Sequence, residues 1–245
     1  MSNSSPASRV ALVQAAPVQA TVLPARCVVY VMDAYCGWCW GFSARIVEFE
    51  AANRQRVPFT AISGGLFTGK RARPISTYPH IPEANTRIAR LTGAHFGEAY
   101  KRVLEEGRMV MNSSDAAAAL AALRDLAPQK AIHWARELQE AFYARGQSLS
   151  EPDTIAGIAA AEGFDAAEVL RRLQDGSAHA QAASDFARAR QFGVSTYPTL
   201  LFVDGPKVQT LPATGTALEV LDKRLDALLA GPRSTTRVGA TARHA

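Results

Sequence analysis

The chain has 245 residues, of which 48% are hydrophobic and 20% charged, and this composition is that of a folded protein with a full core. No apolar run approaches the roughly 18 residues that a membrane span needs, so we expect a soluble protein that does not bind membranes. The net charge of +5 comes from the two ends, because residues 27–230 carry 22 basic and 22 acidic side chains. Nucleic-acid binding is therefore not indicated, since it requires basic charge clustered on an ordered surface.

The two ends of the chain have compositions typical of disorder. Residues 1–26 are rich in Ser, Ala, Pro and Gln, and we predict that they and the tail, residues 231–245, are disordered. The apolar run at residues 10–13 is short and is followed by Gln14, unlike the core of a signal peptide. Three cysteines, two of them in one Cys-x-x-Cys, do not resemble a secreted disulfide framework. These features predict a cytoplasmic location, with the periplasm as the alternative.

A strand, a helix and a second strand are predicted at the start of the ordered region. Residues 27–32 form a β-rich apolar run, which is typical of a strand buried on both faces. The sequence Cys36-Gly-Trp-Cys39 follows, and a helical pattern runs from about residue 40 to residue 53. Residues 57–63 are predicted as a second strand, which ends at Gly64 and Gly65. This order and spacing indicate a βαβ unit with a right-handed crossover.

The middle of the chain is predicted to be helical, and β-structure returns near the end. Between residues 82 and 192, helical segments are separated by Gly or Pro. Residues 199–203 and 207–211 are predicted as strands joined by a tight turn, and residues 216–229 as an amphipathic helix. We therefore predict an α/β protein with a thioredoxin fold, βαβ followed by ββα, and a large inserted all-helical domain. Residues 27–81 and 193–230 would form the thioredoxin-like domain, and residues 82–192 the insertion.

The strongest functional signal is the pair Cys36 and Cys39, which lies between a buried strand and a helix. A thiolate is the reactive form of cysteine, and a free thiol with a pKa of about 8.5 is mostly protonated at neutral pH. The unpaired N–H groups and the dipole of a helix N-terminus stabilise such an anion. Two intervening residues allow the second sulfur to reach back and close a disulfide. We predict that Cys36 is the attacking thiol and Cys39 the shielded, resolving thiol.

A zinc site is the alternative for this cysteine pair. It would need two more ligands, and neither Cys27 nor the five histidines show a paired ligand spacing, so no metal is predicted. Cys27 begins the first strand, roughly 20 Å or more of extended chain before Cys36. We expect Cys27 to be inert unless it is exposed.

The second signal is Pro198, which follows Tyr197 directly before a buried strand. A cis X-Pro bond marks a deliberate tight turn, although the trans bond is the commoner state. Together with the upstream cysteine pair, this position favours a cis Tyr197–Pro198 bond.

Three segments resemble the DsbA family of the thioredoxin superfamily. They are Tyr30-Val-Met-Asp-Ala-Tyr-Cys-Gly-Trp-Cys-Trp-Gly-Phe42, Gly64-Gly65-Leu66 and Val194-Ser-Thr-Tyr-Pro-Thr199. The resemblance is greatest to the predicted protein-disulfide-isomerase branch, with its Cys-x-Trp-Cys motif and its glutathione-linked, DsbM-like members. It covers about residues 27 to 230 and implies Cys36 as the nucleophile, with a cis Pro198 facing it. Ala34 departs from the branch, which often has Pro there, and Gly37-Trp38 replaces the Pro-His of strongly oxidising periplasmic members.

The dipeptide between the cysteines and a nearby basic loop point to a reducing partner. Without a histidine between the cysteines, we expect a potential nearer thioredoxin's, about −270 mV, than DsbA's, about −120 mV. Lys70, Arg71 and Arg73 follow the second strand, at the edge of the sheet where ligands of α/β folds collect, and would suit an anionic thiol such as glutathione. The remaining residues predicted to bind substrate are Trp38, Gly64, Gly65, Tyr197 and Pro198.

These features together predict a thiol–disulfide oxidoreductase that acts on protein or glutathione disulfides. Glutathione would be a co-substrate, and no tightly bound cofactor is expected. One alternative is a glutathione-dependent transferase or isomerase of the kappa-class or chromene-carboxylate isomerase type, whose members typically have serine in place of the first cysteine. Another is a redox-independent chaperone that uses the surface of the helical domain. Asp33 would assist proton transfer or, as we favour, cap the turn before Cys36.

Overall fold

The computed structural model describes residues 23–231. The disorder predicted for residues 1–22 and 232–245 lies outside the described residues. Within residues 23–231, no helix is both long and apolar enough to cross a membrane.

The centre of the molecule is a four-stranded sheet with the strand order β2-β1-β5-β6. Strand β1 (Arg26–Met32) runs parallel to β2 (Phe59–Ser63) and antiparallel to β5 (Thr199–Asp204), and β6 (Lys207–Leu211) closes the second edge. Strand β1 begins one residue earlier than predicted, so Arg26 belongs to the sheet and not to the N-terminal segment. All residues of β1 after Arg26 are buried, which explains the continuous apolar run.

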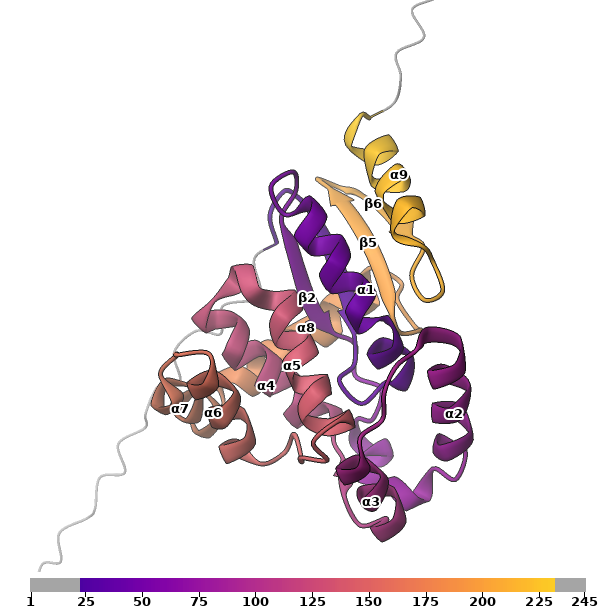
Figure 1. Cartoon of the computed structure of the whole chain (residues 1–245). Coiled ribbons are helices and arrows are strands. Elements are labelled where there is room, and N and C mark those ends of the chain that lie inside the picture. The colour runs from indigo at the N-terminus through magenta and orange to yellow at the C-terminus, as the bar shows by residue number, and fades with distance from the viewer. Residues whose placement is uncertain (1–22, 232–245) are drawn as a thin grey trace, which may run out of the picture.

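Helices cover both faces of this sheet (Figure 1). Val28, Tyr30 and Met32 of β1 face the core formed with α1 (Gly37–Asn53) and α9 (Leu218–Leu229). The alternate residues of β1 face a second, smaller core, to which α8 (Ser177–Gln191) contributes Ala189. Helix α8 lies within the segment predicted as the insertion, yet it forms one of the two layers of the sheet domain.

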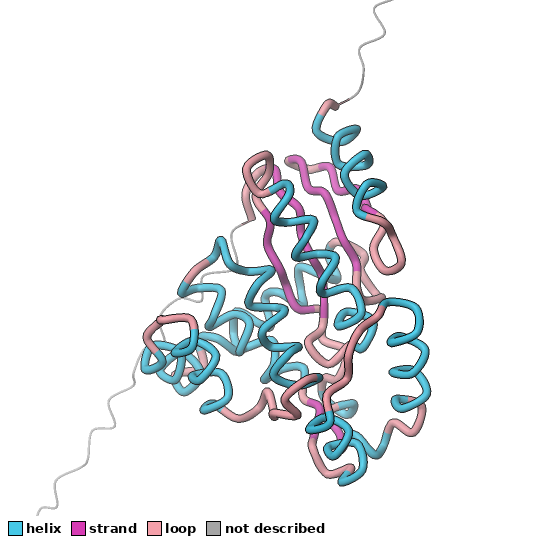
Figure 2. The backbone as a smooth tube through the Cα atoms, viewed as in Figure 1, coloured by secondary structure: helices cyan, strands magenta, loops and turns pink. Residues whose placement is uncertain are grey.

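The long insertion between β2 and β5 is mostly helical, as predicted. Figure 2 shows the strands of the central sheet at one end of the molecule and the helices of the insertion at the other. A short antiparallel ladder between β3 (Arg73–Pro74) and β4 (Val110–Met111) was not predicted and places one two-residue strand inside the otherwise helical segment. The helices of the insertion are α2 (Ile81–Thr92), α3 (Glu98–Glu106), α4 (Ser113–Leu126), α5 (Ala131–Tyr143), α6 (Pro152–Ala161) and α7 (Ala166–Gln174).

A buried ion pair holds the insertion against the sheet. Arg124 of α4 donates to a carboxylate oxygen of Asp185 in α8 at 2.8 Å and to the carbonyl oxygen of Ala61 in β2 at 2.7 Å. The side chains are 3% and 0% exposed. These hydrogen bonds connect α4, α8 and the middle of β2 and fix the insertion relative to the sheet.

Candidate active site

The cysteine pair lies at the start of the first helix. Helix α1 begins at Gly37, three residues earlier than predicted, and Cys36 is its N-cap residue with an extended backbone (φ −85°, ψ 112°). The backbone N–H of Trp40 donates to the carbonyl oxygen of Cys36 at 3.1 Å, so the first turn closes directly behind the thiol. The sulfur of Cys36 therefore lies where the unpaired N–H groups of the helix are concentrated.

The two thiols have opposite environments. Cys36 is 7% exposed and Cys39 is fully buried. The Cys39 thiol donates a hydrogen bond to the Cys36 thiolate, and this bond, together with the backbone N–H groups of Cys39 and Trp38, lowers the pKa of Cys36 despite its burial. Burial, followed by the interactions with Cys36, raises the pKa of Cys39 well above its usual value. The arrangement provides one thiolate that retains some exposure and one shielded thiol.

Asp33 caps the turn between β1 and Cys36, as the favoured interpretation predicts. Its Oδ1 accepts from the backbone N–H of Tyr35 at 3.0 Å, and its Oδ2 accepts from the backbone N–H of Leu66 at 2.7 Å. Burial raises the pKa of this carboxyl group above its ordinary value. The carboxylate also opposes ionisation of both cysteines, so it is electrostatically coupled to the pair.

The Tyr197–Pro198 bond is cis, as predicted from the sequence. The carbonyl oxygen of Tyr197 lies 3.5 Å from the sulfur of Cys36, which donates to it when Cys36 is protonated, although the residues are 161 positions apart. The Tyr197 hydroxyl donates to the carbonyl oxygen of Gly64 at 2.6 Å. A side chain at Gly64 would bring a Cβ atom to 1.9 Å from the Tyr197 ring, so glycine is required for this contact.

The three basic residues predicted to bind glutathione lie in different surroundings. Arg71 donates to the carbonyl oxygen of Gly65 at 3.3 Å, and its charge favours ionisation of Asp33 and Tyr197. Lys70 is exposed at the surface, and Arg73 pairs its backbone with Met111 in the β3–β4 ladder. Arg71 is therefore the member of the predicted loop that lies near Asp33 and Tyr197, the two residues next to the cysteine pair.

The dipeptide between the cysteines contacts α2. The Arg87 guanidinium lies over the Trp38 ring, 5.8 Å from its centroid. An added Cβ at Gly37 or Gly41 would come within 3 Å of Ile88, so the two glycines, four residues apart on one face of α1, allow α2 to pack closely. Arg87 and Ile88 were not predicted as site residues.

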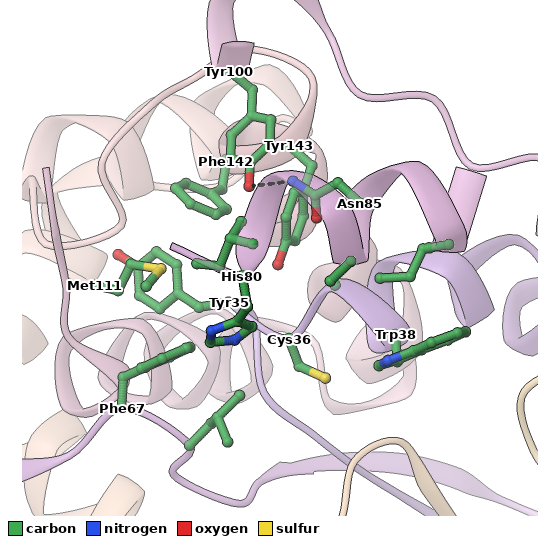
Figure 3. A pocket seen from close by; sticks show the side chains of 15 residues that line it. Tyr35, Cys36, Trp38, Phe67, His80, Asn85, Tyr100, Met111, Phe142 and Tyr143 are labelled. Carbon is green, nitrogen blue, oxygen red and sulfur yellow. Dashed lines mark hydrogen bonds between the residues drawn. The ribbon is translucent and has the colours of Figure 1, made fainter. Parts of the chain in front are cut away.

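A cavity of about 160 Å³ lies beside Cys36 and the start of α1. Its lining includes the aromatic side chains of Tyr35, Phe67, Phe142 and Tyr143, and Asn85 of α2 (Figure 3). These residues were not predicted as site residues; the insertion, which holds Asn85, Phe142 and Tyr143, was predicted only as helix, and Tyr35 and Phe67 precede it. The one available signal was Asn85, a polar residue between Ile81 and Ile88 on the apolar stripe of its helix.

Cys27 lies apart from the cysteine pair, on the other face of β1. Cys27 is fully buried on the α8 side of β1, and burial raises the pKa of its thiol to about 11, consistent with the inert role predicted for it. In the part of the chain that the structure describes, no three His, Cys, Asp or Glu side chains lie close enough to hold a metal ion together.

The fold and the site define the class of this protein. A thioredoxin-type sheet with a cysteine pair at the start of α1 and a cis proline facing it is the architecture of a thiol–disulfide oxidoreductase. The chain belongs to the family of the DSBA-like thioredoxin domain, whose model matches residues 27–225. A comparison with curated protein sequences gave no match.

Solved structures share this fold at low sequence identity. A candidate protein disulfide isomerase from Nitrosomonas europaea is 20% identical, with a TM-score of 0.72 over 84% of this chain and 98% of that one. The cytosolic disulfide reductase DsbM from Pseudomonas aeruginosa is 22% identical, with a TM-score of 0.70 over 82% of this chain and 98% of that one, and it has also been solved with GSH. A 2-hydroxychromene-2-carboxylate isomerase is 12% identical, with a TM-score of 0.58 over 82% of this chain and 95% of that one.

Proposed function

We propose that this protein is a cytoplasmic disulfide reductase that exchanges disulfides with glutathione or protein substrates through Cys36 and Cys39. The observation that carries the proposal is the pairing of a Cys36 thiolate, stabilised at the start of α1, with a buried Cys39 thiol that donates to it. The absence of a histidine between the cysteines supports the reducing direction, because no cation lies between them to favour the thiolate further. The fold shared with a cytosolic reductase supports the location.

The reaction transfers two electrons to the substrate. The Cys36 thiolate attacks one sulfur of the substrate disulfide, which forms a mixed disulfide and releases one thiolate. The Cys39 sulfur then attacks the Cys36 sulfur, releases the second thiolate and gives up its proton to a departing thiolate. The product is a Cys36–Cys39 disulfide. Two molecules of glutathione would reduce it again when the substrate is a protein disulfide, and a protein dithiol would reduce it when the substrate is oxidised glutathione.

The Tyr197 carbonyl and Arg71 are the groups we propose to orient the substrate. The Tyr197–Pro198 backbone lies next to the Cys36 sulfur and can pair with an extended peptide such as glutathione, as an added strand does. The Arg71 guanidinium can form an ion pair with one of the two glutathione carboxylates. Because Arg71 is exposed, we expect this contact to contribute under about 1 kcal/mol.

Two variants of the cysteines test the chemistry. The wild type should reduce insulin disulfides, and Cys36→Ala should not. Cys39→Ser should accumulate a glutathione adduct on Cys36 when exposed to oxidised glutathione, because the resolving thiol is gone; intact mass detects it. Reduction of insulin by Cys36→Ala would refute the assignment of the nucleophile, and a folded Cys39→Ser protein that forms no adduct would refute the glutathione linkage.

A matched pair of variants tests the role of Arg71. Arg71→Ala should lower the turnover of oxidised glutathione more than that of an uncharged disulfide such as bis(2-hydroxyethyl) disulfide. Lys70→Ala, which removes the same charge from the neighbouring exposed position, should affect both substrates equally. An equal effect of Arg71→Ala on both substrates would contradict its proposed role.

The transferase or isomerase alternative is less well supported, since both cysteines are present and paired. Conversion of an electrophilic substrate by Cys36→Ser with glutathione, without net disulfide reduction by the wild type, would favour it.

A further inference from the structure

The cavity beside Cys36 has the size and the walls of a site for one aromatic ring. Its volume is about 160 Å³, and an engineered apolar cavity of about 150 Å³ in another protein binds benzene. Tyr35, Phe67 and Phe142 supply aromatic walls, against which a ring can pack edge-to-face or offset. Among the described residues that line the cavity, none is Asp, Glu, Lys or Arg, and the lining groups that can carry a charge are Cys36 and His80.

Two polar atoms in this cavity have capacity for a ligand. The Tyr143 side chain is 2% exposed, and its hydroxyl forms no hydrogen bond with any described residue. Figure 3 shows this hydroxyl directed into the space between Asn85 and Cys36. Asn85 donates its amide N–H to the Tyr100 hydroxyl at 2.9 Å, which leaves its Oδ1 without a partner among residues 23–231.

These two atoms lie together at the start of α1. A Cβ added at Gly37 would be 3.4 Å from Asn85 Oδ1 and 3.9 Å from the Tyr143 hydroxyl. Burial raises the pKa of Tyr143 well above its usual value, so this hydroxyl remains a proton donor at neutral pH. A donor next to an acceptor matches a group that both accepts and donates, and a ligand hydroxyl is such a group.

We propose that the cavity lined by Asn85 and Tyr143 is a subsite for a single aromatic ring bearing a hydroxyl group. Because Cys36 also lines the cavity, the ring would belong to the thiol or disulfide that Cys36 attacks. The proposal of a ring-binding subsite depends only on the geometry of the cavity. The assignment of the ring to the substrate of Cys36 rests on the proposed function. The ring can come from a small aryl thiol or from a tyrosine beside a peptide cysteine.

Ligand binding tests the site independently of activity. Phenol binding to the full chain is measured by ligand-observed NMR, with toluene, in which a methyl group replaces the hydroxyl, as the matched ligand. Tyr143→Phe should weaken phenol binding at least threefold and leave toluene binding unchanged, because only phenol loses a hydrogen bond. Ala84→Leu, which fills the cavity from α2, should weaken both ligands at least fivefold, whereas Thr86→Leu on the exposed side of that helix should weaken neither.

Turnover tests the connection with Cys36. The kcat/KM for bis(4-hydroxyphenyl) disulfide is divided by that for bis(2-hydroxyethyl) disulfide, and the ratio is compared between proteins, since aryl disulfides are intrinsically more reactive. Ala84→Leu should lower the ratio at least fivefold and Thr86→Leu should not. Peptide disulfides with Tyr or Ala beside the cysteine extend the same comparison, and a fall confined to the Tyr peptide would identify a peptide as the source.

The outcomes separate the two proposals. Phenol binding that Ala84→Leu does not weaken, or no phenol binding by the folded wild type, would overturn the subsite. Phenol binding that depends on Ala84 and Tyr143, in a protein that reduces no disulfide, would leave the subsite standing and refute the proposed function. An unchanged turnover ratio in Ala84→Leu, with binding weakened as predicted, would overturn the link between the ring and the attacked sulfur.

Discussion

The acidity of Cys36 depends on its nearest neighbours more than on the solvent around it. The hydrogen bond from the Cys39 thiol is the largest cause that lowers its pKa, while burial and the Asp33 carboxylate oppose it. Sequence analysis attributed the effect to the helix N-terminus alone. The backbone N–H groups of Trp38 and Cys39 also lower the pKa of Cys36, but the hydrogen bond from the Cys39 thiol lowers it most.

Removal of the Cys39 thiol should therefore raise the pKa of Cys36. In the reduced wild type, the rate of alkylation of Cys36 should reach half its maximum below a pH of about 8.5, the pKa of a free thiol. In Cys39→Ala the midpoint should move upward, and in Cys39→Ser it should lie between the two, because a hydroxyl can still donate. The absorbance of the thiolate, followed against pH, provides a second measurement of the same midpoint. An unchanged midpoint in Cys39→Ala would assign the low pKa to the helix N-terminus.

At the scale of elements, the site depends on the contact between Gly64, directly after β2, and Tyr197, in the loop before β5. Gly64 directly follows β2, and the absence of a side chain there leaves space for the Tyr197 ring. The position of the Tyr197 carbonyl beside Cys36 therefore depends on a residue that touches neither cysteine. This explains the glycine at 64 as a packing requirement, whereas sequence analysis grouped Gly64 with the substrate-binding residues.

Gly64→Ala should destabilise the protein and slow its reaction. The added Cβ forces the Tyr197 ring away, and overpacking of this kind costs about 1–3 kcal/mol in the free energy of unfolding. Gly157→Ala is the matched control, because nothing lies within 4 Å of its added Cβ on the exposed face of α6, where alanine should stabilise by up to about 1 kcal/mol. Denaturant unfolding and insulin reduction measure both variants. Equal stability and activity of Gly64→Ala and the wild type would contradict this packing role.

The elements that could be predicted were those with a clear periodicity or a motif. Strands β1, β2, β5 and β6, the order of the fold and the cysteine pair followed from local sequence, and the cis Pro198 followed from its position combined with the cysteine pair upstream. The cavity did not, because its lining comes from α1, α2, α3, α5, β4 and the segment after β2, which lie far apart in the sequence and leave no local pattern. The role of α8 in the sheet domain was missed for the same reason, since a helical pattern does not reveal which surface the helix covers.

At the scale of the whole molecule, the buried pair of Arg124 and Asp185 joins the insertion to the sheet. Arg124→Ala should lower the free energy of unfolding by about 3–5 kcal/mol, because it leaves the Asp185 carboxylate buried without its cation. Arg45→Ala, which breaks an exposed pair with Glu48, should cost under about 1 kcal/mol. Denaturant unfolding measures both losses, and similar values for the two variants would show that the buried pair does not hold the domains together.

The redox equilibrium of Cys36 and Cys39 with glutathione shows whether the pair works as a reducing dithiol. The protein is equilibrated in buffers of varied glutathione and oxidised glutathione, trapped by alkylation, and the oxidised fraction is measured by intact mass. We expect a reversible two-electron transition between Cys36–Cys39 dithiol and disulfide, with a potential nearer about −270 mV than about −120 mV. A pair that forms no disulfide at any ratio, or one whose potential lies near about −120 mV, would contradict this expectation.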